Sequence, residues 1–150
     1  IDMPPGTGDV QLTLSKSIAL AGAVIVSTPQ SVALQDAMKA KRMFDKVKVP
    51  ILGVIENMST YVCTACGHEE AIFGSEGTSC LLDDASVPLL GQMPLNKSIR
   101  EAADDGVPMV VQSPDSLLSQ RYHRMASIMT VQVAKQPRQY SGHFPNIAVE

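Results

Sequence analysis

The chain has 150 residues, of which 45% are hydrophobic and 18% charged, and its formal net charge at pH 7 is −3. This composition is typical of a globular protein, and the lack of a basic block argues against binding to nucleic-acid phosphates. No apolar run approaches the roughly 20 residues that a membrane-spanning helix needs.

Short apolar runs alternate with helical patterns along the chain. Residues 1–2 are interpreted as the end of a first strand, and three further strands are predicted at residues 23–28, 51–57 and 88–93. Runs this short and this apolar are typical of strands covered on both faces of a parallel sheet. The sequence therefore predicts an α/β fold with a doubly wound, mostly parallel sheet, in which ligands bind at the carboxyl ends of the strands.

Three helices are predicted between and after these strands. Residues 31–47 carry apolar side chains at helical spacing and place lysines on the opposite face. Asn96 is expected to cap a helix over residues 97–105, which Gly106 ends. Ser113-Pro114 is expected to begin the last helix, with the serine as its cap and the proline in its first turn.

Residues 1–135 are interpreted as one domain with an insertion at residues 61–68, and residues 136–150 as a C-terminal tail. The phosphate-binding motif Gly-x-x-x-x-Gly-Lys-Ser/Thr does not occur in the sequence, although it usually accompanies this kind of sheet. The chain is therefore expected to be the C-terminal half of a longer nucleotide-binding protein.

Candidate nucleotide-binding residues follow the predicted strands. Asp2 precedes a loop of prolines and glycines and can order Mg²⁺ or its waters. Asn57 has an amide that donates and accepts at once, which suits the edge of a purine base. The alternative is a turn-forming asparagine, which spacing alone favours. Pro94 and Leu95 follow the last strand and complete the expected binding edge.

Cys63 and Cys66 form a Cys-x-x-Cys pair in a hairpin-like stretch, which fits a reducing compartment and metal or redox chemistry. Two thiolates can bind one metal, but zinc or a cluster needs about four ligands. His68 can supply a third, although a polar loop residue is the simpler interpretation, and Cys80 is expected to be a small buried residue. A second copy of the chain would complete a four-thiolate site. A thioredoxin-like dithiol is the alternative, but it needs the first cysteine to begin a helix.

Taken in order, several segments resemble one known family. The segments are Ile1-Asp-Met-Pro-Pro-Gly-Thr-Gly-Asp9, Ala23-Val-Ile-Val-Ser-Thr-Pro-Gln30, Val49-Pro-Ile-Leu-Gly-Val-Ile-Glu-Asn-Met-Ser59, Cys63-x-x-Cys-Gly67, Ile72-Phe-Gly74, Leu90-Gly-Gln-Met-Pro-Leu95 and Ile99-Arg-Glu101. This series strongly resembles the C-terminal half of the Mrp/ApbC/NUBPL family of ATP-dependent iron–sulfur carriers. The resemblance covers residues 1–111, and more loosely the last helix.

The resemblance implies a MinD-like P-loop fold, a homodimer, and a 4Fe–4S cluster bridged between the two subunits. It implies that Cys63 and Cys66 bind the cluster and that Asp2 is the catalytic Walker B aspartate near the Mg²⁺ of bound ATP. It also implies that Asn57 contacts the base, which overturns the interpretation from spacing. Because the phosphate-binding lysines are not among these residues, the chain by itself is not expected to hydrolyse ATP.

The implied function is delivery of the cluster to apo iron–sulfur proteins, with no nucleic-acid partner and no membrane span. The sequences Cys-Gly-His68 and Gly-Gln-Met-Pro94 are closer to bacterial members, so the bacterial cytoplasm is expected and the mitochondrial matrix is the alternative. Two other functions stay open. A MinD/ParA-like regulatory ATPase would want a membrane-binding or basic face, which the last helix lacks, and a structural zinc module would hold zinc without iron or sulfide.

Overall fold

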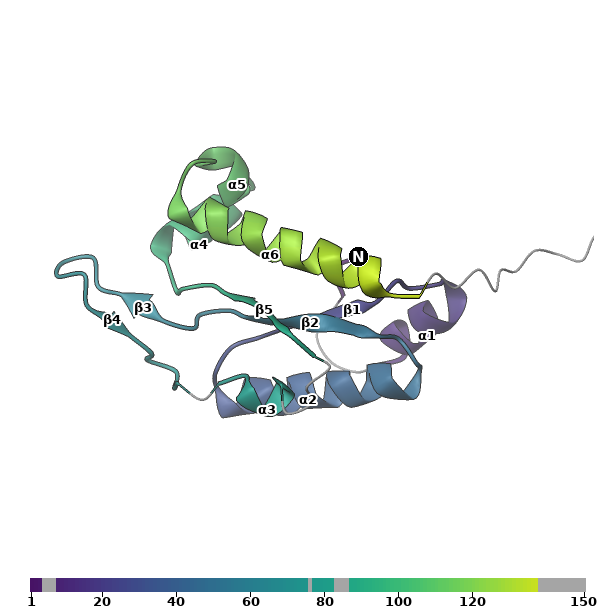
Figure 1. Ribbon diagram of the computed structural model, residues 1–150. Helices are drawn as coiled ribbons and strands as arrows, with labels where there is room; N and C mark the ends of the chain where they lie inside the picture. The colour runs from purple at the N-terminus through teal and green to yellow at the C-terminus, as the bar shows by residue number, and fades with distance from the viewer. Residues whose placement is uncertain (4–7, 76, 83–86, 138–150) are drawn as a thin grey trace, which may run out of the picture.

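The computed structural model describes residues 1–3, 8–75, 77–82 and 87–137. Its main sheet is parallel and has the order β1-β2-β5, with β1 at Ala23–Ser27, β2 at Ile51–Glu56 and β5 at Leu89–Gln92. A second, antiparallel sheet pairs β3 (Tyr61–Val62) with β4 (Glu69–Glu70) and projects from the end of the main sheet (Figure 1). The α/β class and the parallel sheet predicted from the sequence are confirmed.

Helices cover both faces of the main sheet (Figure 1). On one face lies α2 (Ser31–Lys46) with the short α3 (Ser79–Leu82), and on the other lies α6 (Leu117–Lys135). The remaining helices are α1 (Asp9–Ser17), α4 (Lys97–Asp104) and α5 (Met109–Gln112). No helix in the described part of the chain is long and apolar enough to cross a membrane.

The core lies between the sheet and α2. Val54 and Leu81 are both fully buried and pack with three further buried residues, Ile25, Ala37 and Val87. On the opposite face, α6 comes close to β5 because Gly91 has no side chain. A Cβ atom at Gly91 would lie 2.4 Å from Cγ of Met125, so the glycine makes room for this buried methionine.

The strand expected at residues 1–2 is absent, since residues 1–3 lie outside every helix and strand. A strand forms only where its backbone bonds to a neighbour, and the described strand order gives residues 1–3 no partner. The helix α1 is not predicted from the sequence. Its apolar residues Val10, Leu12 and Leu14 alternate with a period of two, so they form no helical stripe.

The capping predictions gave one correct and one wrong result. The Asn96 side chain accepts a hydrogen bond from Ser98 N at 2.8 Å and caps α4, as expected. The prediction that Ser113 begins the last helix is wrong, because Ser113 ends α5. Its carbonyl accepts the hydroxyls of Ser116 and Ser119, which fold the connecting turn. The cap of α6 is therefore Ser116, whose Oγ accepts from Ser119 N at 3.2 Å.

Candidate functional site

The carboxyl ends of β1, β2 and β5 meet at one edge of the sheet (Figure 1). Ser27 is in register with Glu56, and Glu56 with Gln92, so the three strands end side by side. The ladder continues past the strands, because Asn57 N donates to Ser27 O at 2.7 Å and Met93 N donates to Glu56 O at 2.9 Å. This edge is where parallel α/β sheets bind ligands.

Asn57 lies on this edge and is half-buried. Its Oδ1 accepts a hydrogen bond from Met58 N at 3.0 Å, and Met58 has a φ of 55°. The side chain therefore supports a left-handed residue, as the turn interpretation expects. The amide nitrogen of Asn57 donates no hydrogen bond within the described residues, so the same side chain keeps a free donor for a ligand.

Pro94 and Leu95 continue from β5 beside the outgoing chain of β2. Leu95 N donates to Thr60 O at 2.7 Å, and a parallel bridge pairs Leu95 with Tyr61. Pro94 is buried and Leu95 is half-buried. These two residues therefore join the strand edge to the root of the β3–β4 hairpin.

Thr28 follows β1 at the same edge. Its Oγ1 is buried and has no hydrogen-bond partner in the part of the chain that the structure describes. Burying a hydroxyl without a partner costs free energy, so among the described residues Thr28 marks a point of this edge where a polar partner is missing.

Asp2 is exposed and lies outside every helix and strand. The N-terminus lies well away from the β3–β4 hairpin in Figure 1. The Pro-Pro-Gly-Thr loop at residues 4–7, which the sequence analysis joins to Asp2, falls outside the described residues. The structure therefore brings Asn57, Pro94 and Leu95 together, and it does not place Asp2 at a strand end.

Cys63 and Cys66 lie in the turn between β3 and β4, as the hairpin prediction expects. Cys63 N donates to His68 O at 2.8 Å, and Gly67 N donates to Cys63 O at 2.8 Å, so backbone bonds close the turn. Gly67 has a φ of 73°, which favours glycine at this position. No helix begins at Cys63, so the geometry disfavours the thioredoxin-like alternative.

The turn favours the thiolate form of Cys63. The backbone N–H groups of Ala65 and Cys66 point at the sulfur of Cys63 and, together with the Cys66 thiol, hold the pKa of Cys63 below its usual value. Both cysteines are free; Cys63 is half-buried and Cys66 is exposed. Thiolate is the form that binds metal, so this turn fits a soft metal or an iron–sulfur cluster.

Further protein ligands are not gathered around the pair. The described residues contain no group of three or more His, Cys, Asp or Glu side chains able to hold a metal ion. His68 is exposed, and Cys80 packs from α3 against the core with its Sγ 4.0 Å from Gly77 O. One chain therefore offers two thiols to a metal in the part that is described.

Glu56 lies at the same edge, as its place at the end of a predicted strand indicates, but the sequence pattern assigned no role to this buried carboxylate. Glu56 is 6% exposed and accepts hydrogen bonds from Thr78 and Gln92. The available signal was a charged residue closing an otherwise apolar strand, since a buried charge needs specific partners.

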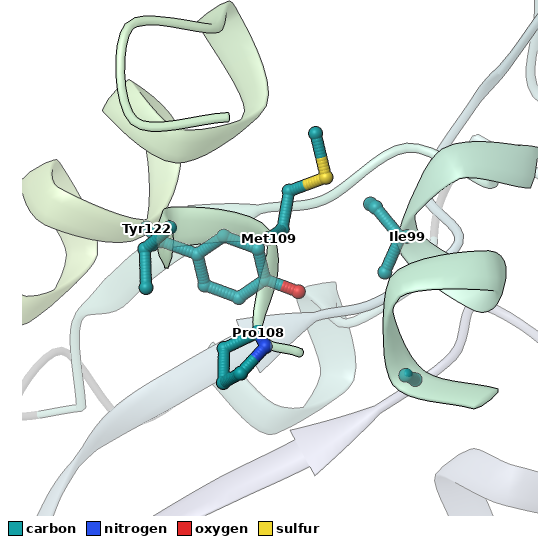
Figure 2. A pocket seen from close by; sticks show the side chains of 6 residues that line it. Ile99, Pro108, Met109 and Tyr122 are labelled. Atoms are coloured by element: carbon teal, nitrogen blue, oxygen red, sulfur yellow. The ribbon is translucent and has the colours of Figure 1, made fainter. Parts of the chain in front are cut away.

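A separate cavity of about 240 Å³ lies among α4, α5 and α6. Figure 2 shows the ring of Tyr122 reaching from α6 toward Ile99 of α4, with Pro108 and Met109 beside it. Its lining is apolar apart from the tyrosine hydroxyl, and it contains none of the residues predicted to form the site.

Comparison with known proteins gives a consistent picture. The family model described as "ParA: NUBPL iron-transfer P-loop NTPase" matches residues 1–130. The chain is 50% identical over 133 residues to the iron-sulfur cluster carrier protein of Escherichia coli K12, covering 89% of this chain and 36% of that protein. It is 53% identical over 126 residues to the mitochondrial iron-sulfur protein required for NADH dehydrogenase of Arabidopsis thaliana, covering 84% and 40%.

Solved structures agree with this placement. A nucleotide-binding protein from Archaeoglobus fulgidus in complex with ADP has a TM-score of 0.61 and 32% identity, covering 76% of this chain and 46% of its own. The cell division ATPase MinD of Pyrococcus furiosus has a TM-score of 0.58 and 25% identity, covering 74% and 43%. The MinD-like fold implied by the resemblance is therefore confirmed over the part of these proteins that the chain spans.

Proposed function

The chain belongs to the NUBPL iron-transfer P-loop NTPase family, and on that premise we propose that the whole protein carries an iron–sulfur cluster and delivers it to acceptor proteins. The chain spans 36% to 40% of the two relatives compared above. The activity, substrates and partners of the whole protein are therefore parts of this proposal. The observation that carries it is the Cys63–Cys66 turn, which presents two accessible thiols with backbone N–H groups aimed at one sulfur.

The cluster is cargo, and Cys63 with Cys66 supplies half of the four thiolates that a 4Fe–4S cluster usually takes. The other half comes from the same turn of a second copy, so the protein works as a homodimer with the cluster at its two-fold axis. The exposure of the hairpin, with both strands only two residues long, leaves the thiols accessible to a partner.

Loading and delivery are ligand exchanges without net electron transfer. Each cysteine gives up its thiol proton as its sulfur bonds to iron. On delivery, a thiolate of an apo iron–sulfur protein replaces each Fe–S(Cys) bond, and the released cysteine takes a proton back. The N–H groups of Ala65 and Cys66 favour the thiolate of Cys63, so they support the loaded form.

Nucleotide binding is the second part of the proposal. ATP with Mg²⁺ binds at the strand edge, with the free amide of Asn57 on the base and Pro94 and Leu95 beside it. Asp2 acts on the Mg²⁺ side as the catalytic carboxylate, and the phosphate-binding loop comes from the rest of the protein. Within the described residues, the Thr28 hydroxyl has no hydrogen-bond partner and the Asn57 amide nitrogen donates no hydrogen bond, which supports a ligand at this edge. Residues 1–150 alone are expected to be inactive as an ATPase.

The relatives point to two possible compartments for the whole protein. They include a bacterial protein and one whose name is mitochondrial. We propose the bacterial cytoplasm, with the mitochondrial matrix as the alternative.

Anaerobic reconstitution of the full-length protein with iron and sulfide tests the cluster proposal. We expect about one four-iron cluster per dimer, and Cys63→Ala or Cys66→Ala should abolish its visible absorbance and its iron and sulfide content. Cys80→Ala is the matched control and should load normally, because Cys80 packs on the core.

Normal loading of the Cys63→Ala protein would overturn the assignment of the ligands. Zinc without iron or sulfide in the purified protein would instead favour a structural zinc module. A monomer that holds a complete cluster would contradict the shared site.

A further inference from the structure

The loop that carries both cysteines begins and ends at one side chain. The chain leaves β2 after Glu56, passes through Asn57 and the β3–β4 hairpin, and returns to Glu56 at Thr78, 22 residues later. Closing a loop of this length costs conformational entropy, so a contact at its base decides how well the loop is ordered.

Glu56 makes three hydrogen bonds that close this base. Its Oε2 accepts from Thr78 N at 3.0 Å and from Thr78 Oγ1 at 2.9 Å, and its Oε1 accepts from Gln92 Nε2 at 2.8 Å. Glu56 and Thr78 are only 6% and 4% exposed. Hydrogen bonds to a carboxylate are stronger than neutral ones, and burial makes their loss more costly.

The packing at Gly77 shows how closely the returning chain fits. A Cβ atom at Gly77 would lie 2.4 Å from Oε2 of Glu56 and 2.8 Å from Cβ of Pro29. The backbone at this position therefore reaches the carboxylate only because glycine has no side chain, and it also touches the loop after β1.

The two limbs of the loop are held in different ways. The outgoing limb bonds to the chain after β5 through its backbone, since Ser59 N donates to Met93 O at 2.9 Å and Leu95 N donates to Thr60 O at 2.7 Å. In the described part of the returning limb, Thr78 is the residue that bonds to the main sheet, and it does so through Glu56. The outgoing limb is thus held by backbone bonds and by the Ser59 hydroxyl, which donates to Met93 O at 3.2 Å, whereas the described part of the returning limb is held to the sheet by the Glu56 side chain.

We propose that Glu56 is a positioning residue that closes the cysteine loop and holds its base against the strand edge. This inference deepens the proposed function and rests on it for the use of the loop. Glu56 touches neither thiol. It acts by fixing where the hairpin and the neighbouring Asn57 start, so its loss should loosen the cysteine loop before it affects the rest of the sheet.

Hydrogen–deuterium exchange of the full-length apo protein tests this without any cluster. In Glu56→Ala we expect amides of residues 57–78 to exchange about tenfold faster, with β1 and α2 unchanged. Glu56→Gln should stay within about threefold of wild type, because its oxygen can accept both Thr78 bonds and the Gln92 amide can reverse to accept the third. Thr60→Val is the matched control, since it removes only the exposed bond to Glu69.

A second readout is cluster retention in the reconstituted protein. A chelator should remove iron about tenfold faster from Glu56→Ala than from wild type, with Glu56→Gln again near wild type. Unchanged exchange at 57–78 in Glu56→Ala, an equal effect in Glu56→Gln, or faster exchange spread evenly over the sheet would overturn the inference.

The design keeps the two proposals separable. If wild-type protein takes up no cluster, the proposed function fails while the exchange measurement still decides the role of Glu56. If Glu56→Ala does not fold, Thr78→Val takes its place, because it removes only one of the three hydrogen bonds. Faster amide exchange confined to residues 57–78 in this variant would support the inference, and unchanged exchange there would overturn it.

Discussion

The carboxyl end of the main sheet and the cysteine hairpin are neighbours in the fold, but they differ in how much of their apolar surface is buried. Val54 of β2 and Leu90 of β5 are 0% and 1% exposed. The hairpin, by contrast, exposes both residues of β3 and both of β4. One region is held by buried apolar surface, and the other by backbone hydrogen bonds and a few polar contacts.

This difference in burial implies that the sheet contributes most of the stability, while the hairpin carries the thiols. The proposed cluster, shared between two copies, would need thiols that project into solvent, and a projecting element cannot also bury much apolar surface. The hairpin is instead ordered by the Cys63–His68 and Gly67–Cys63 backbone bonds and by its attachment to the strand edge. Substitutions in the two regions should therefore affect different measurements.

The largest expected effect is on the free energy of unfolding. Leu90→Ala in the full-length protein should cost about 2–5 kcal/mol, because it leaves a cavity in a close-packed core. Val62→Ala in β3, where the side chain is 41% exposed, should cost less than about 0.5 kcal/mol. Urea unfolding followed by circular dichroism measures both.

An equal loss of unfolding free energy in Leu90→Ala and Val62→Ala would contradict the difference in burial between the sheet and the hairpin. That result would mean that the hairpin is covered in the full-length protein, by the rest of the chain or by a second copy.

A smaller effect is expected on nucleotide affinity at Asn57. Asn57→Asp keeps an oxygen for Met58 N but removes the amide donor, whereas Asn57→Ala removes both. If the amide contacts the base, both variants should bind ATP about tenfold more weakly, which corresponds to about 1.4 kcal/mol. Calorimetry on the full-length protein at fixed ionic strength gives the affinities.

Wild-type affinity in Asn57→Asp combined with weak binding in Asn57→Ala would assign the residue to the turn alone. The pair of variants thus separates the two interpretations that the spacing of the sequence left open.

Much of the sheet could be predicted because its strands are short apolar runs. The predictions at residues 23–28, 51–57 and 88–93 correspond to β1, β2 and β5, each within two residues at either end. The residues of β2 are all buried or half-buried, whereas Val26 of β1 is 61% exposed and Leu89 of β5 is 37% exposed, so the apolar runs mark the strands better than they mark burial. The residue order then placed Asn57, Pro94 and Leu95 just after strand ends, and the structure brings these three residues to one edge of the sheet.

The errors occur where local signals compete or where a contact spans the fold. Ser113-Pro114 and Ser116 both have the sequence features of a helix start. In the structure Ser113 is the C-cap of α5, so the last helix begins after Ser116. The role of Glu56 depends on Thr78 and Gln92, which are 22 and 36 residues away. Sequence spacing carries no information about such partners.

The smallest expected effect concerns the acid–base chemistry of the hairpin. The N–H groups of Ala65 and Cys66 and the Cys66 thiol lower the pKa of Cys63. Its thiolate should therefore persist as the pH falls below the usual thiol pKa of about 8.5, and should be lost only below its own lowered pKa. Alkylation of Cys63 by iodoacetamide should reach half of its maximal rate at a lower pH in the folded apo protein than in the same protein in urea.

The midpoint of this curve, rather than the rate at one pH, is the quantity to compare. A lower pKa has two opposite effects on alkylation: it raises the fraction of Cys63 that is thiolate at a given pH, and it makes each thiolate a weaker nucleophile. A measurement at a single pH would mix these two effects. Mass spectrometry of the Cys63 peptide gives the rate at each pH, and urea removes the backbone N–H contacts while keeping the same residue. Identical midpoints in the folded and unfolded protein would show that the turn does not stabilise the thiolate. The hairpin would then make the thiols accessible to metal without lowering the pKa of Cys63.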